Sequence, residues 1–169
     1  ILPEHGGSEL FRVEEVPKPE TKPGHVLIQV AASSVNPVDF KIRQGLIPIG
    51  PELPGILHGD MAGVVEDVGE GVKGFAPGDE VYGCIGGFKG LPGVLADYAL
   101  ADAQLLAKKP SNLSMEDAAA LPLVTITAWN ALMDRAKVSE GQRVLVHAAA
   151  GGVGHVGLQL AKAAGAEVH

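Results

Sequence analysis

The sequence predicts an α/β protein with an all-β first part and the opening of a parallel sheet in its second part. Residues 1 to about 110 hold most of the prolines, and their short strand-like runs alternate with turn signals. After Pro110 come alanine-rich helical segments, a strand, a glycine-rich turn, a helix and a further strand. This last order is typical of a β–α–β unit. We expect one domain over residues 1–124 and a second over residues 125–169.

Two runs in the first domain read as strands because β-branched and aliphatic residues dominate them. They are His25–Ala32 and Ala62–Gly69. A Pro-Gly-Asp turn ends at Asp79, and a further strand is predicted from about Glu80. These elements favour an antiparallel arrangement with short connections.

The second part carries helix signals on either side of a buried strand. Ser114 is a predicted N-cap, with acidic residues in the turn that follows it. A second helix is predicted over Thr127–Ala136 and a strand over Arg143–His147. The last helix should end at Gly165 and bury one apolar face, formed by Val153, Val156, Leu160 and Ala164.

Composition excludes several classes of function. The formal net charge of -7 argues against nucleic-acid or anionic-membrane partners, which need a basic surface. Cys84 is the single cysteine, so an internal disulfide and a multi-thiolate metal site are both excluded. No apolar run is long enough for a transmembrane helix, and no signal-peptide pattern is visible. We expect a cytoplasmic protein.

The glycine-rich turn matches a nucleotide-binding fingerprint in part. Aligned on its last glycine, G-x-G-x-x-G falls on Ala149, Gly151 and Gly154, between a predicted strand and a predicted helix. Backbone N–H groups at the helix start would face a pyrophosphate, which the helix dipole favours. A plain strand-to-helix turn is the competing interpretation.

Four stretches in order resemble one family: "AASSVNPVDFKIRQG", "AGVVEDVGEGVKGFAPGDEVYG", "AAALPLVTITAW" and "VLVHAAAGGVG". The chain resembles the zinc-independent quinone oxidoreductase (ζ-crystallin-like) family of the medium-chain dehydrogenase/reductase superfamily. The resemblance implies a GroES-like β-barrel domain followed by the start of a Rossmann domain, truncated here. It also implies NADPH as cofactor and hydride transfer to a quinone, a conjugated enone or an alkenal.

The same resemblance implies that zinc is absent. Zinc-dependent relatives place their ligands at positions that Asn36, Gly59 and Leu123 occupy in this chain. One alternative is a zinc alcohol dehydrogenase that has recruited other ligands, such as His58 and Asp60. Another is a non-catalytic binding or structural protein that keeps the fold.

The resemblance also implies a set of site residues. Asn36, Asp39 and Lys41 would be catalytic, and the cofactor would contact Pro37, Val38, Thr127, Trp129, Ala149, Ala150, Gly151, Gly152, Val153 and Gly154. Read locally, Asn36 and Asp39 form a turn that bonds its own backbone. Lys41 would pair with a cofactor phosphate or with Asp39. For Thr127 and Trp129 the alternative role is helix packing.

A complete dinucleotide-binding sheet has about six strands, and this chain carries about two of them. The residue that would select NAD or NADP lies beyond His169, so NADPH follows from the family alone. We therefore expect the 169-residue chain alone to be an inactive fragment and the full-length protein to form a homodimer.

Overall fold

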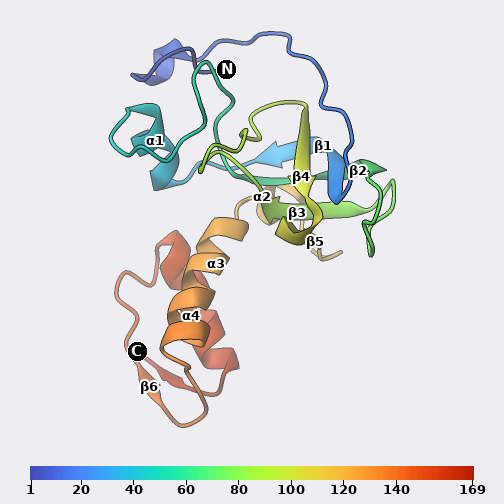
Figure 1. Ribbon diagram of the computed structural model, residues 1–169. Coiled ribbons are helices and arrows are strands. Elements are labelled where there is room, and N and C mark those ends of the chain that lie inside the picture. The colour runs from blue at the N-terminus through green and yellow to red at the C-terminus, as the bar shows by residue number, and fades with distance from the viewer. The chain divides into compact units, whose positions relative to one another are not determined.

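The computed structural model describes residues 1–169, and the chain divides into two compact units (Figure 1). The first unit is Ile1–Pro122 and the second is Leu123–His169. No helix in either unit is long and apolar enough to cross a membrane.

The first unit is built on a five-stranded antiparallel sheet with the order β4-β1-β2-β3-β5. Ala62 in the second strand faces Ala32 on one side and Tyr82 on the other. Two register shifts interrupt the pairing of the first two strands. The strands are β1 His25–Ser33, β2 Asp60–Val68, β3 Glu80–Cys84, β4 Tyr98–Asp102 and β5 Leu106–Lys108.

Apolar packing covers both faces of this sheet. One face carries the main core, in which Ile28, Met61 and Val81 are fully buried. On the other face Ala62 packs against Ala118 and Ala119 of helix α2, Met115–Ala119. Small side chains at these positions allow a helix to lie directly on the strand. Burial on both faces explains why the strands read as almost continuous apolar runs.

Helix α1, Pro37–Arg43, follows the first strand after a short connection. It begins with proline at its first position, where the missing N–H costs nothing. It is followed by Gly45, whose φ of 72° lies in the left-handed region. Ile42 anchors it in a second, smaller apolar cluster with Leu2 and Leu57. Short 3₁₀ turns complete the unit at η1 Ser8–Leu10 and η2 Ala103–Leu105.

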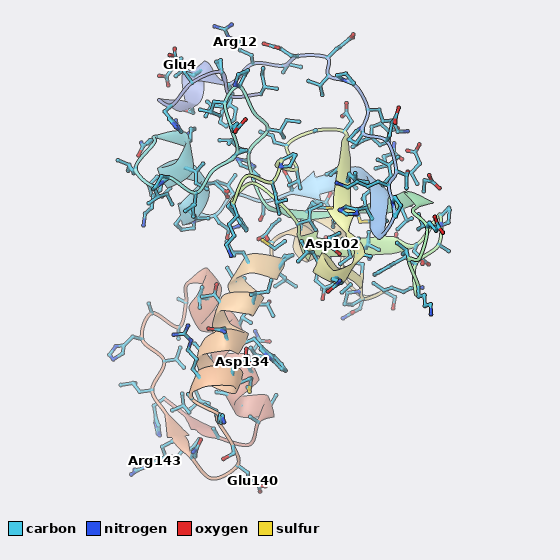
Figure 2. The ribbon with its side chains drawn as sticks, viewed as in Figure 1. Glu4, Arg12, Asp102, Asp134, Glu140 and Arg143 are labelled. Carbon is cyan, nitrogen blue, oxygen red and sulfur yellow. The ribbon has the colours of Figure 1, made fainter.

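Two short parallel strands and a connecting helix form the end of the second unit. Strand β6, Arg143–Val144, pairs in parallel with β7, Glu167–Val168, and α4, Gly152–Ala163, joins them. This unit begins with α3, Pro122–Trp129, which continues into a π-helical turn η3, Asn130–Arg135. Figure 2 shows the side chains, with Asp134, Glu140 and Arg143 labelled in this unit.

Several expected elements are confirmed within one or two residues. Strands occupy both predicted runs and begin at Glu80, Ser114 accepts a hydrogen bond from the Asp117 N–H at 3.0 Å, and α4 stops just before Gly165. Gly165 has a φ of 83°, as a left-handed residue at the end of a helix requires.

Two boundaries are wrong. The strand expected over Arg143–His147 is cut to two residues, because its only partner is the short strand that ends the chain. The helix expected to begin at Thr127 already begins at Pro122, whose fixed φ suits a first helical position.

The buried face of α4 also differs from the expected one. Val156 is buried, but Val153 is 42 % exposed, and the other buried positions are Gly157 and Ala161. A Cβ at Gly157 would lie 3.5 Å from Leu132 and 3.9 Å from Ala128. The helix therefore packs through its smallest side chains. The spacing of apolar residues in the sequence does not predict this buried face.

The N-cap at Ser114 offers a simple stability test. Ser114→Ala removes the hydrogen bond to the Asp117 N–H and should lower the free energy of unfolding by about 1 kcal/mol. Urea denaturation followed by tryptophan fluorescence and circular dichroism measures the change. Ser111→Ala, at an exposed serine that does not cap the helix, is the control and should leave stability within about 0.5 kcal/mol.

Candidate functional site

A buried polar cluster lies where β1 ends and β2 begins. Asn36 precedes α1, and its backbone N–H donates to Asp39 Oδ2 at 2.6 Å. The Asp39 N–H donates to the Asn36 carbonyl oxygen at 2.9 Å. The local turn expected from "NPVD" is therefore present, and it fixes both side chains at the helix start.

The Asn36 side chain reaches across to the next strand. Its Nδ2 donates to Asp60 Oδ2 at 2.9 Å, and the Ser34 hydroxyl donates to the same oxygen at 3.4 Å. Asp60 is fully buried, so these bonds are made away from water, where an unpaired carboxylate would be costly. The amide of Asn36 thus has a defined orientation, set by a carboxylate on a different strand.

Two further titratable side chains border the cluster. Burial raises the pKa of Asp39, and the Asp60 carboxylate adds to this, while the hydrogen bond from Asn36 and the proximity of His58 oppose it. Burial also raises the pKa of Cys84, with further contributions from the charge and the hydrogen bond of Asp60. Cys84 is therefore held as a thiol, which is a weak nucleophile.

His58 is the residue of this cluster that sequence reasoning did not select for the proposed reaction. Its φ is 69°, its side chain is buried, and its Nδ1 has no hydrogen-bond partner. Burial lowers the pKa of His58, and the charge of Asp39 opposes that shift. A histidine in a turn just before a strand gives no sequence signal for these features, because they arise from tertiary packing.

No three histidine, cysteine, aspartate or glutamate side chains come together in a way that could hold a metal ion. His58 and Asp60 would supply two of the three protein ligands that a catalytic zinc site needs. The position where zinc-dependent relatives place a cysteine holds Asn36, whose amide is bonded to Asp60.

The turn before α4 has the features that a pyrophosphate needs. The first helical bond runs from the His155 N–H to the Gly151 carbonyl, so the N–H groups of residues 152–154 have no partner within the helix. Gly151 caps the helix without a side-chain bond, and no acidic residue occupies the first turn. Gly151, Gly152 and Val153 are exposed. These residues fit the phosphate-binding part of a dinucleotide site.

The glycines of this turn have different roles. A Cβ at Gly154 would lie 2.8 Å from the Ala149 Cα, so only glycine allows the helix and the preceding turn to pack this closely. A Cβ at Gly151 would lie 3.3 Å from the Ala148 carbonyl oxygen, with no other atom within 4 Å. The left-handed residue of the turn is Ala148, with a φ of 55°, one position before the first fingerprint position at Ala149.

The structure places the other predicted site residues less specifically. Lys41 and Pro37 are exposed on α1 whereas Asp39 is buried, and Val38 packs against the second apolar cluster. In the second unit Ala150 is exposed, the Thr127 hydroxyl donates to the Leu123 carbonyl at 2.7 Å, and Trp129 is 50 % exposed.

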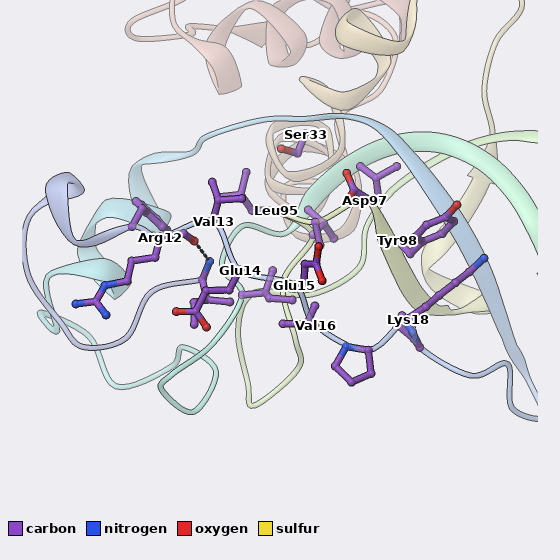
Figure 3. Close-up of a pocket in the computed structure, with 18 of the residues that line it drawn as sticks. Arg12, Val13, Glu14, Glu15, Val16, Lys18, Ser33, Leu95, Asp97 and Tyr98 are labelled. Atoms are coloured by element: carbon purple, nitrogen blue, oxygen red, sulfur yellow. Dashed lines mark hydrogen bonds between the residues drawn. The ribbon is translucent and has the colours of Figure 1, made fainter.

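A groove of about 920 Å³ lies elsewhere in the first unit, between the extended residues 11–19 and the segment that leads into β4 (Figure 3). Lys18 lies over the Tyr98 ring, 3.9 Å from its centroid, and also pairs with Glu66. Tyr98 is thus engaged in a surface contact, and none of the residues of the buried polar cluster lines this groove.

Comparisons with known proteins agree with this architecture. Residues 22–111 match the alcohol dehydrogenase GroES-like domain. The chain is 43% identical over 166 residues to the 2-methylene-furan-3-one reductase of Solanum lycopersicum, covering 94% of this chain and 42% of that protein. A solved alcohol dehydrogenase superfamily protein from Novosphingobium aromaticivorans is 48% identical with a TM-score of 0.95, over 99% of this chain and 50% of that one.

The Escherichia coli quinone oxidoreductase, solved in complex with NADPH, is 32% identical with a TM-score of 0.81, over 99% of this chain and 50% of that one. The chain belongs to the alcohol dehydrogenase superfamily of medium-chain dehydrogenases/reductases, among relatives that include quinone oxidoreductases. It spans about half the length of the curated relatives it matches.

The lowered pKa of His58 makes a prediction about acid stability. Below about pH 6.5 the unfolded chain binds a proton at this histidine more readily than the folded chain does, so stability falls as the pH falls. His58→Asn keeps a residue that tolerates positive φ and removes the titration. We expect a smaller loss of unfolding free energy between pH 7.5 and pH 5.5 in this variant, measured by urea denaturation.

His5→Asn is the control, because His5 is an exposed histidine of the same unit. If the His58→Asn chain lost as much stability on acidification as the unmutated chain, that result would contradict this account of His58.

Proposed function

We propose that the full-length protein is an NADPH-dependent reductase of quinones or conjugated enones and that it works without zinc. The observation that carries this proposal is the bond from Asn36 Nδ2 to Asp60 Oδ2. Asn36 places a neutral amide at the position where, by the family resemblance, zinc-dependent relatives carry a cysteine ligand. The first domain then offers a hydrogen-bonded polar cluster in place of a metal site.

Each unit carries one segment that the proposal assigns to NADPH. The exposed N–H groups at the start of α4 would bind the pyrophosphate, and Gly151 would let it approach the backbone. Residues Pro37–Lys41 would contact the nicotinamide half, with Asn36 and Asp39 fixing the course of the backbone there. Bound NADPH would supply the hydride, and the protein would align the acceptor with it.

The substrate class follows from the groups that this cluster lacks. Oxidation of a saturated alcohol needs a base for the hydroxyl proton, and such help is worth about 10²–10⁴-fold. Val38 occupies the position where zinc alcohol dehydrogenases carry a relay hydroxyl, and no metal-binding group is assembled. A conjugated acceptor spreads the incoming charge over its own π system. Two of the relatives named above are, by their names, a reductase of 2-methylene-furan-3-one, which is a conjugated ketone, and a quinone oxidoreductase.

The assay that tests this proposal compares two directions of hydride transfer in the full-length protein. NADPH oxidation is measured with 1,4-benzoquinone and with a short alkenal, and NADP reduction is measured with ethanol and a secondary alcohol. We expect turnover with the conjugated acceptors only, and less than 0.1 zinc per chain by elemental analysis, roughly the background for a site without three ligands. Faster turnover of an alcohol, or one zinc per chain, would overturn the proposal.

Two glycine substitutions separate cofactor binding from folding. Gly151→Val adds a side chain where pyrophosphate would lie and should weaken NADPH binding at least tenfold, since each charge-assisted hydrogen bond is worth about 1.5–3 kcal/mol. Its Tm should stay within about 2 °C because the site is exposed. Fluorescence titration of the full-length protein with NADPH gives the Kd.

Gly154→Val is the matched variant, because its Cβ would press on the backbone of Ala148 and Ala149. We expect it to lower the Tm. An unchanged Kd in Gly151→Val would mean that this turn only joins a strand to a helix.

A further inference from the structure

His58 combines two costly features at one residue. Its φ of 69° lies in the left-handed region, which is a rare conformation for a bulky side chain. Its side chain is 8 % exposed, and its Nδ1 is fully buried with no hydrogen-bond partner. Backbone strain and unpaired buried nitrogens persist only where the surrounding structure imposes them, and they concentrate at functional sites.

The packing around His58 fixes its backbone. The Val94 N–H donates to the His58 carbonyl at 3.0 Å. A Cβ at Gly87 would collide with the same peptide group, and a Cβ at Gly59 would lie 2.8 Å from the Phe88 ring. These close approaches hold the residue in place without any bond from the imidazole. The ring is therefore not needed to hold the turn.

The protonation state of the ring follows from its environment. Burial lowers the pKa of His58 more than the Asp39 charge raises it, so the imidazole is neutral at pH 7. A neutral imidazole carries one N–H, and a buried N–H without a partner is rarer than a buried acceptor without one. Because Nδ1 is buried without a partner, an N–H there would be unsatisfied, so we place the hydrogen on Nε2.

We propose that His58 is a catalytic residue whose Nε2–H donates a hydrogen bond to the carbonyl oxygen of a conjugated substrate. This inference rests on the proposed function. It is supported by position, because His58 stands two residues before Asp60, to which Asn36 is bonded, and it lies close to Asp39. The ring therefore belongs to the same polar cluster as the segment assigned to the nicotinamide.

Reduction of a conjugated enone requires only a hydrogen bond from His58. One hydride, carrying two electrons from NADPH, adds to the β-carbon of an enone, and the C=C electron pair moves to form an enolate. Negative charge collects on the carbonyl oxygen, where a fixed N–H stabilises it. Water then protonates the enolate, and His58 keeps its own proton throughout.

Two substitutions at this position separate the donor from the backbone strain. His58→Gly suits a φ of 69° and removes the imidazole, whereas His58→Asn also tolerates positive φ and restores an N–H donor. The full-length protein is assayed with 2-cyclohexenone for kcat, with NADPH titration for Kd, and by thermal unfolding for Tm.

We expect the glycine variant to lose about 10²-fold in kcat, as is typical for one oxyanion-hole donor, with NADPH Kd within twofold. Its Tm falls because the ring packs against Phe11, and the variant stays folded at the assay temperature. The asparagine variant should recover at least tenfold of that loss.

Each other result overturns the inference. Wild-type kcat in the glycine variant means that the ring does not act, and weaker NADPH binding or unfolding at the assay temperature there means that its role is structural. A kcat in the asparagine variant as low as that of the glycine variant means that the N–H is not what matters. Inactivity of the unmutated protein with every conjugated acceptor overturns the proposed function itself, and this inference with it.

Discussion

The hydrogen bond from Asn36 Nδ2 to Asp60 Oδ2 is the contact on which the arrangement of the polar cluster depends. It joins the residue that precedes α1 to the first residue of β2, and β1 and β2 are adjacent strands. A buried carboxylate needs such partners, because without them its desolvation would cost several kcal/mol. The same bond orients the amide and sets the start of α1, so one interaction satisfies a charge and places a helix.

Much of the fold was predictable where short-range chemistry decides it. Ser114 and Gly165 mark helix ends through a side chain and through backbone freedom, and the sequence alone displays both. Helix α1 was not among the predicted elements, because its first residues read as a local turn. The length of β6 and the start of α3 were not predictable in the same way. The length of β6 depends on how many residues its partner strand has. The start of α3 depends on whether the helix begins at Pro122 or at Thr127.

The candidate site also contains residues that local sequence signals predict and residues that only tertiary structure reveals. Asn36 and Asp39 were predicted because a turn motif and a family resemblance both pointed to them, and the structure buries both. His58 was not selected because its distinguishing features are a positive φ and an Nδ1 without a hydrogen-bond partner. Neither feature can be predicted from the residue type. Ala148 is a similar case, since an alanine in the sequence does not indicate a positive φ.

The state of Cys84 has a consequence for a protein that would handle quinones and enones. Such compounds are Michael acceptors, and they alkylate thiolates rather than thiols. Burial and the neighbouring Asp60 both keep this sulfur protonated, and it is the single cysteine of the chain. Within residues 1–169 such an acceptor would therefore meet a thiol and no thiolate. The carboxylate that orders the polar cluster thereby also holds the neighbouring sulfur in its less reactive form.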